Sequence, residues 1–366
     1  MSQRRLSSLQ LFFLFVLTLT IANHTLTIPL VLGAAKRDAW MSVLLSVVPG
    51  VLLLLAVKHI MNTSRREPLL PWVKRHFGPF ASGAVGVVLV AYLLSNTMIS
   101  VKDTVTWVDA TFLPDTPGFV IGAALSVLCF IAAYAGLWSI AVCAGMLLPF
   151  VVVLEEFVVF ANFPLKNYRH MTPLLEHGMS PVWSGLVYTA SGIAEIVLVL
   201  LVQHRLKANV RSRAIYWALA VVVFFILQEM IESIVNFGPS EAAAQRYPSF
   251  EQWGLVTLGK SVSHLDFLSI YEWLSGSFVR ISLGVYLAIE LTRTKGKAAR
   301  KLVLGAMFSF MIAVPLLPVN DSMFERFLRR MYYPYSLALM VAVVLVLLAF
   351  SAIVRAKERG RASHAQ

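Results

Sequence analysis

The chain has 366 residues, of which 58% are hydrophobic and 14% are charged, and its mean hydropathy is +0.75. Soluble domains average about 45–50% apolar and about 25% charged residues, so this composition excludes a water-soluble enzyme of this length as well as a disordered chain. The formal net charge of +12 would suggest a nucleic-acid partner in a soluble protein. In a membrane protein such an excess sets orientation instead, and we predict an integral membrane protein.

Ten segments are long and apolar enough to cross a bilayer, which takes about 20 residues per helix. The first is too long for the apolar region of a signal peptide, which covers about 7–15 residues. The fourth and fifth run together around Gly136, and Pro315 and Pro318 end the short ninth. The predicted spans cover residues 9–32, 39–60, 80–101, 118–137, 139–161, 182–203, 214–235, 269–291, 302–318 and 332–354.

The basic residues are unevenly distributed between the two sets of loops. With a cytoplasmic N-terminus, 20 of the 31 Lys and Arg residues fall on cytoplasmic segments and 10 on outer segments. This asymmetry predicts that both termini are cytoplasmic, with an even number of spans and a cytoplasmic tail over residues 355–366. Because no basic patch is interleaved with aromatic residues, we expect no nucleic-acid partner.

We interpret residues 1–366 as a single transmembrane domain with two halves of five spans each. An odd number of spans gives the halves, residues 9–161 and 182–354, opposite orientations, as in the inverted repeats of many secondary transporters. The sequence therefore predicts an all-α polytopic bundle of the transporter type. Residues 236–268 are predicted to form an outer loop that carries a helix lying along the membrane surface.

The first span contains residues that are costly in a membrane helix. Asn23, His24, Thr25 and Thr27 stand just before Pro29, which removes an intrahelical hydrogen bond. Interrupted backbone at membrane depth is tolerated only inside protein or along a wet cavity. A proline kink with threonine hydroxyls bonded back to the helix remains one interpretation, and an unwound ligand site, which we expect, is the other. His24 is weak evidence for proton coupling.

The sixth span is interrupted at a corresponding position. Ser191 and Gly192 belong to a run of small residues that lets two helix backbones approach closely. Glu195 follows within an apolar stretch, and an ionisable residue inside the membrane is a functional candidate unless it is a protonated, hydrogen-bonded structural residue. A pair of interrupted spans at corresponding positions indicates a transporter-like binding site, so the first and sixth helices are predicted to be broken.

Arg280 lies in the middle of the eighth span, shortly after Ser277. Its guanidinium stays charged in proteins and requires a carboxylate partner or a wet cavity. Glu195 and Glu272 are both candidates, and a structural ion pair is as plausible as a ligand contact.

Ligand contacts are expected mainly from the first, third, sixth and eighth spans. The third offers Tyr92, Ser95, Asn96 and Ser100, which the sequence does not rank. The predicted ligand-binding residues are Asn23, His24, Thr25, Thr27, Ser95, Asn96, Ser191, Gly192, Glu195, Ser277 and Arg280.

The sequence suggests neither an enzyme nor a metalloprotein. Cys129 and Cys143 lie in apolar runs and are interpreted as structural thiols, and no spacing of Cys and His indicates a metal site. No phosphate-binding glycine loop or hydrolase motif is present. We therefore predict no catalytic residue, no metal and no cofactor, and we interpret the remaining acidic residues, such as Glu155 and Glu229, as lying at the interface or at a cavity mouth.

Short motifs follow one another over nearly the whole chain. They are Leu6–Phe13 at the start, Lys36–Trp40 in the first outer loop, Leu113–Pro117 before the fourth span, Ala133–Ala141 after it, Tyr247–Ser249 and Leu265–Phe267 before the eighth span, and Gly276–Ser282 within it. In their order and spacing the chain resembles the spore germination permeases. These are the B subunits of nutrient germinant receptors in endospore-forming bacteria, within the amino acid–polyamine–organocation superfamily. The glycines usual at the first-helix break and before Glu195 are absent here.

The resemblance implies a sensor more than a carrier. It implies a subunit that binds a small nutrient, often an amino acid, in a transporter-like pocket in the inner membrane of the spore. The partners it implies are the receptor's A subunit and its lipoprotein C subunit. Binding would trigger ion release and germination, which requires that the nutrient bind one of two states more tightly.

Two alternatives share the same fold and stay open at this point. The interrupted helices, His24 and Glu195 also suit an ion-coupled amino acid permease. A passive conduit for water or ions within the receptor complex is the third reading.

Overall fold

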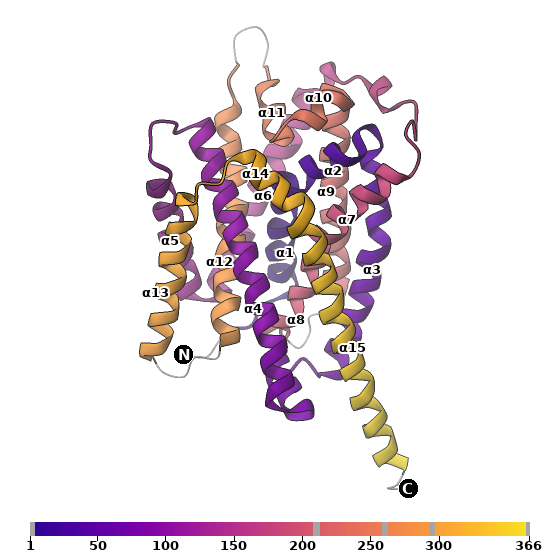
Figure 1. Ribbon diagram of the computed structural model, residues 1–366, viewed down its shortest axis with the longest axis vertical. Helices are drawn as coiled ribbons and strands as arrows, with labels where there is room; N and C mark the ends of the chain where they lie inside the picture. The colour runs from indigo at the N-terminus through magenta and orange to yellow at the C-terminus, as the bar shows by residue number, and fades with distance from the viewer. Residues whose placement is uncertain (1–3, 208–212, 258–262, 293–296, 364–366) are drawn as a thin grey trace.

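The structure is a computed structural model that describes residues 4–207, 213–257, 263–292 and 297–363. These residues form a bundle of long helices (Figure 1). Its α-helices are α1 Ser8–Ala22, α2 Ile28–Ala35, α3 Ala39–Thr63, α4 Leu69–Thr111, α5 Gly118–Ala135, α6 Leu137–Ala161, α7 Ser180–Ala194, α8 Val199–Val202, α9 Arg213–Phe237, α10 Pro239–Ala244, α11 Pro248–Gly254, α12 Ser269–Thr292, α13 Lys297–Ala313, α14 Asp321–Phe327 and α15 Tyr333–Ser363.

The all-α polytopic fold class is confirmed. Within the described residues, eight helical stretches are long and apolar enough to cross a membrane. The first, Ser8–Thr63, contains two predicted spans joined at Lys36–Asp38, and a shorter apolar helix covers Lys301–Leu316. A helix therefore covers each of the ten predicted spans. Gly136, whose φ of 98° favours glycine, separates α5 from α6 where the two spans run together in the sequence.

The two ends of the bundle differ. One end carries the short helices α10, α11 and α14, and we call it the loop end (Figure 1). The described chain begins and finishes near the opposite end, which agrees with an even number of crossings. Which end faces the cytoplasm stays a prediction, as does the inverted repeat of two five-span halves.

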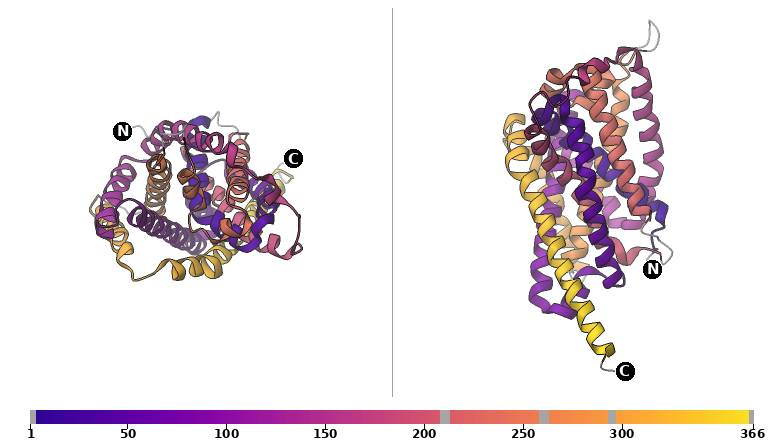
Figure 2. Two further views of the ribbon diagram at one scale, coloured as in Figure 1. Left: turned by 90° about the horizontal axis from the view of Figure 1, so that it is seen from above. Right: turned by 90° about the vertical axis from the view of Figure 1, so that its right-hand side faces the viewer.

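α1, α7 and α12 are the most deeply buried long helices of the bundle. Most of their side chains are buried, as expected for membrane helices surrounded by other helices. Figure 2 shows the bundle along its axis and from the side, with the remaining long helices around these three. Helices α5, α6 and α15 expose large apolar side chains in the manner of a lipid-facing surface, among them Leu128, Ile131, Phe150, Val153 and Leu345.

The start of the first span is fastened to the end of the sixth. Ser7 and Gln10 form a capping box, in which each side chain accepts the other's backbone amide at 3.2 and 3.0 Å. Just before it, the Leu6 amide donates to the Arg205 carbonyl at 2.8 Å, and the Lys207 amide donates to the Leu6 carbonyl at 2.9 Å. The two interrupted spans are thus joined at one end through backbone hydrogen bonds.

The first span widens in its middle instead of unwinding. Residues Asn23–Thr27 form one turn of π-helix between α1 and α2, in which the Ile28 amide donates to the Asn23 carbonyl. Pro29 follows and has no amide to donate. A π turn accommodates one extra residue in a helix, often at a functional site. The prediction of an unwound segment is therefore wrong, because the backbone forms a π turn. The departure from α geometry nevertheless lies where it was predicted.

The sixth span tightens at its interruption. α7 ends at Ala194, a 3-10 turn covers Glu195–Leu198, and α8 is followed by a second 3-10 turn at Gln203–Arg205. Here too the backbone stays helical, so the predicted break of the sixth helix is a change from α to 3-10 geometry. Glu195 lies at the junction of the two geometries, and its side chain is buried.

The third span is much longer than predicted. α4 runs from Leu69 to Thr111 across a kink at Gly78, whose φ is 85°. The predicted end of this span at residue 101 is too early, because the helix continues for eight more residues after Asp103. The span was predicted to end here because polar residues follow the apolar run. In the structure Asp103 is buried inside the bundle, so the helix continues past it.

The predicted surface helix in residues 236–268 is two short helices in the described part, with residues 258–262 outside it. α10 packs against α2 and α9, and α11 against α9, at the loop end. Gln252 and Trp253 of α11 are buried, so this segment folds onto the bundle. Of the predicted tail 355–366, α15 continues to Ser363, and residues 364–366 lie outside the described chain.

Candidate functional site

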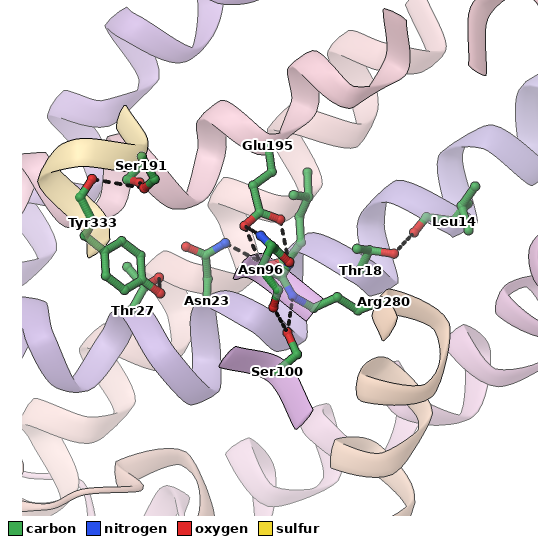
Figure 3. Close-up of polar contacts among 12 residues, drawn as sticks. Leu14, Thr18, Asn23, Thr27, Asn96, Ser100, Ser191, Glu195, Arg280 and Tyr333 are labelled. Carbon is green, nitrogen blue, oxygen red and sulfur yellow. Dashed lines mark hydrogen bonds and ion pairs between the residues drawn. The ribbon is translucent and has the colours of Figure 1, made fainter. Parts of the chain in front are cut away.

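A buried ion pair joins the sixth and eighth predicted spans. Arg280 of α12 donates from Nη1 to Glu195 Oε2 and from Nη2 to Glu195 Oε1, both at 2.6 Å (Figure 3). Each residue is only 6% exposed. Such a two-pronged geometry is the strongest form of a carboxylate–guanidinium contact. Glu272, the other candidate partner, instead accepts a hydrogen bond from Trp253 Nε1 at 2.9 Å.

The third span completes the coordination of this pair. Asn96 donates from Nδ2 to Glu195 Oε1 at 2.7 Å, and Arg280 donates from Nε to Ser100 Oγ at 2.8 Å. Ser100 in turn donates to the Asn96 carbonyl at 3.0 Å, one helical turn earlier. α4 therefore supplies one group to each member of the ion pair. Ser95, the neighbouring candidate, bonds back to the Ala91 and Tyr92 carbonyls of its own helix and does not reach the pair.

The two interrupted helices touch each other next to the ion pair. A Cβ atom added at Gly192 would overlap the Asn23 side chain, so only glycine permits this approach. Asn23 donates from Nδ2 to the Leu19 carbonyl at 2.7 Å, while its buried Oδ1 has no hydrogen-bond partner in the described structure. Gly276 of α12 is likewise packed against Ile21. The small residues thus bring three helices together around the centre.

The last span also contributes to the centre, which the sequence reasoning missed. Thr27 donates to the Tyr333 hydroxyl at 3.1 Å, and the hydroxyls of Ser191 and Ser336 lie 2.7 Å apart (Figure 3). Tyr333 and Ser336 lie one helical turn apart at the start of the tenth span, and this spacing of polar residues could have indicated that the span reaches the centre. Ser277 is occupied elsewhere, because it accepts a hydrogen bond from Thr104 at 2.8 Å.

Pro29 leaves two backbone carbonyls of the first span available to the loop end. Lacking an amide, it cannot donate to the carbonyls four and five residues earlier, those of Thr25 and His24. Arg246 Nη1 donates to the Thr25 carbonyl and Ser249 Oγ to the His24 carbonyl, both at 3.5 Å. The π turn is therefore held from the loop that precedes α12.

Arg246 also forms a second buried ion pair. Its Nη2 donates to Asp103 Oδ1 at 2.7 Å, and its guanidinium lies 4.4 Å from the centre of the Tyr247 ring. Asp103 is 2% exposed. This pair connects α4, the π turn and the loop end above the Glu195–Arg280 pair. It was missed because Arg246 lies in a polar loop, where a basic residue carries no sequence signal.

Stacked aromatic side chains close the same end. The Trp107 and Trp273 rings lie parallel with centres 4.2 Å apart, and Phe250 and Tyr247 contact them edge-on at 5.7 and 5.2 Å. Trp107 is fully buried. The centre of the bundle is thus covered from the loop end by an ion pair and an aromatic cluster.

His24 and Thr25 do not join the ion pair. Both line a separate small cavity with Glu155 and Glu229, and both of these acidic side chains are buried. Nine of the eleven predicted ligand-binding residues therefore divide into three groups, and Ser95 and Ser277 belong to none of them because their hydroxyl groups bond elsewhere. Asn96, Glu195 and Arg280 form the polar centre, Asn23, Thr27, Ser191 and Gly192 pack the interrupted helices and α15 together, and His24 and Thr25 face the cavity.

Comparison with known proteins decides the family. A family model described as "Spore germination protein" matches residues 5–323. The chain belongs to the spore germination protein family. One similar protein, spore germination protein XB of Bacillus anthracis, is 35% identical over 339 residues, which are 93% of this chain and 95% of that protein. A second, YfkT of Bacillus subtilis (strain 168), is 23% identical over 280 residues, 76% of each chain.

Membership in this family agrees with the resemblance found in the sequence. This spore germination protein is an integral membrane protein by the number and apolar character of its long helices. The matched region includes α1, α7 and α12, the π and 3-10 turns that follow α1 and α7, and the Glu195–Arg280 pair.

Proposed function

We propose that this chain is the nutrient-binding membrane subunit of a spore germinant receptor, and that the nutrient is a zwitterionic amino acid. The Glu195–Arg280 pair carries the proposal. A free amino acid carries one carboxylate and one ammonium group. The carboxylate can bind the Arg280 guanidinium and the ammonium group can bind the Glu195 carboxylate, so the ligand replaces the contact that the two side chains make with each other. A zwitterion inserted between the two side chains would satisfy both charges without leaving either one unpaired in a buried site.

The surrounding residues suit such a ligand. Asn96 and Ser100 offer a further donor and acceptor on the side of α4, and the unpartnered Asn23 Oδ1 is an acceptor beside Gly192. Charged ligand groups in a water-free site are bound strongly only when such partners surround them. Ligand entry from the loop end requires the Arg246–Asp103 pair and the aromatic cluster to move, which gives the protein two states for a nutrient to discriminate.

In this proposal the chain acts as a sensor in the inner membrane of the spore, with cytoplasmic termini, beside the A and C subunits of the receptor. The nutrient favours a rearranged state of α1, α7 and α12, and the partner subunits respond to that rearrangement. No chemical transformation of the nutrient is involved.

The test is nutrient binding by the full-length protein in lipid nanodiscs. The panel contains the L-amino acids, sugars and nucleosides, and binding is followed by the shift in melting temperature, since a ligand at 100 times its Kd stabilises by about 2.7 kcal/mol. We expect an amino acid to bind, and Glu195→Gln to weaken it by about tenfold or more. Glu251→Gln, at an exposed position of α11, is the matched control.

Two outcomes would contradict the proposal. One is a panel in which sugars or nucleosides bind while amino acids do not. The other is amino acid binding that is equally tight in Glu195→Gln and in the control. Substrate-driven uptake into proteoliposomes separates the sensor from an ion-coupled permease, because a sensor binds the nutrient without accumulating it.

A further inference from the structure

A second polar site lies away from the Glu195–Arg280 pair, in a cavity of about 40 Å³ near the loop end. Four ionisable side chains from four helices line it: His24 of the π turn, Glu155 of α6, Glu229 of α9 and Glu272 of α12. A water molecule needs about 10–15 Å³ measured in this way, so the cavity has room for an ion with one or two waters.

Three of these side chains converge on one point. His24 Nε2 and Glu155 Oε1 lie 3.8 Å apart, and one ligand atom from each of His24, Glu155 and Glu229 lies within 4.8 Å of the other two. Metal–ligand bonds of about 2.0–2.2 Å place ligand atoms up to about 4.4 Å apart. A small rotation of the side chains is therefore enough for all three to contact one ion.

Two of the converging atoms have no other partner. His24 Nε2 and Glu155 Oε1 are buried and accept or donate no hydrogen bond in the described structure. His24 is 6% exposed and Glu155 is 7% exposed. The backbone of Phe225 hydrogen-bonds to the His24 imidazole, as the backbone carbonyls behind metal-binding histidines commonly do. Buried polar atoms without partners are rare, and a bound ion is one of their physical explanations.

The acidic side chains around the cavity favour the binding of a cation. Its described lining contains three carboxyl groups and no Lys or Arg. Gln252 donates to Glu229 and Trp253 to Glu272, but both donors are neutral. Neighbouring buried carboxylates repel each other unless a cation or a proton compensates them.

The donor set narrows the kind of cation. An imidazole nitrogen with carboxylate oxygens is the ligand combination of Zn²⁺, Mn²⁺, Fe²⁺ and Co²⁺, whereas Ca²⁺, Mg²⁺ and the alkali ions prefer oxygen ligands alone. We propose that His24, Glu155 and Glu229 bind one divalent transition-metal ion, with Glu272 close enough to act as a fourth ligand directly or through water. The ion would clamp the π turn of the first span to α6 and α9 at the loop end.

This proposal is independent of the proposed nutrient site, which uses Asn23, Asn96, Glu195 and Arg280 and none of the three proposed metal ligands. Binding is measured on the full-length, metal-free protein in nanodiscs, with Zn²⁺ followed by calorimetry and Co²⁺ by its visible absorption bands. The variants are Glu155→Gln and Glu229→Gln. Two variants are used so that the test can still be made if one of them fails to fold. Glu156→Gln is the matched control, because this adjacent residue of α6 accepts a hydrogen bond from Gln228 and does not line the cavity.

We expect one equivalent of Zn²⁺ or Co²⁺ per chain, and affinity about tenfold or more lower in each folded cavity variant than in the control. The Co²⁺ spectrum should report a nitrogen–oxygen ligand set that an excess of Ca²⁺ does not displace. The proposal is overturned if neither metal binds, if both variants bind as tightly as Glu156→Gln, or if Na⁺, K⁺ or Ca²⁺ competes on equal terms with Zn²⁺.

Discussion

The Glu195–Arg280 pair makes the most direct quantitative test of the structure. Glu195→Gln keeps the volume of the side chain and one acceptor oxygen but removes the negative charge. Apart from residue 195, Arg280 then has one hydrogen-bond acceptor, the Ser100 hydroxyl. Removing one partner of a buried ion pair costs about 3–5 kcal/mol, because the other charge stays buried and unpaired. We expect a loss of this size in the free energy of unfolding.

The second arm removes both charges. In Glu195→Gln combined with Arg280→Met no charge is left unpaired, so the double variant should be much more stable than the sum of the single changes predicts. The coupling energy of this double-mutant cycle should be about 2–3 kcal/mol. The assay is reversible unfolding of the purified protein in detergent micelles, with each variant measured under identical lipid and salt conditions.

A surface ion pair of the same protein supplies the control. Arg75 and Glu67 approach to 2.7 Å, but their side chains are 58% and 34% exposed. The same cycle there should give about 1 kcal/mol or less, because water screens the charges. If the Glu195–Arg280 cycle is no larger than the Arg75–Glu67 cycle, the reasoning from burial is wrong for this site.

Two further predictions concern the interrupted helices and the loop end. Gly192→Ala should destabilise the protein by about 1–3 kcal/mol because its Cβ meets Asn23, and Asn23→Ala should relieve the loss. Gly83→Ala, where no atom lies within 4 Å of the added Cβ, should be neutral or stabilising, and equal effects of the two alanine changes would contradict the assigned packing. Arg246→Ala should expose the π turn, so that a Thr25→Cys reporter reacts faster with a membrane-impermeant maleimide. Arg37→Ala, which removes an ion pair with the half-exposed Glu176, should leave that rate unchanged, and an unchanged rate in both variants would refute the role of Arg246.

The buried centre shows how far pattern reasoning extends for a membrane protein. A charge inside an apolar segment requires a partner, so Glu195 and Arg280 stand out in the sequence as soon as the spans are counted. The choice of Glu195 over Glu272 does not follow from helix periodicity. It depends on how α7 and α12 each pack against the first span, where Gly192 approaches Asn23 and Gly276 approaches Ile21. The preference for Asn96 and Ser100 over Ser95 depends in the same way on the rotation of α4.

The sequence by itself determined the membrane class, the helix over each predicted span and the positions of the two interruptions. These features depend on local composition: apolar length, proline, small residues and isolated charges. Only the tertiary structure decided the form of the interruptions, because Arg246 and Ser249 satisfy the carbonyls that Pro29 leaves free, and the helix has no need to unwind. The same holds for the cavity of His24, Glu155 and Glu229. Those residues lie far apart in the chain, and only the packing of three helices brings their ligand atoms within 4.8 Å.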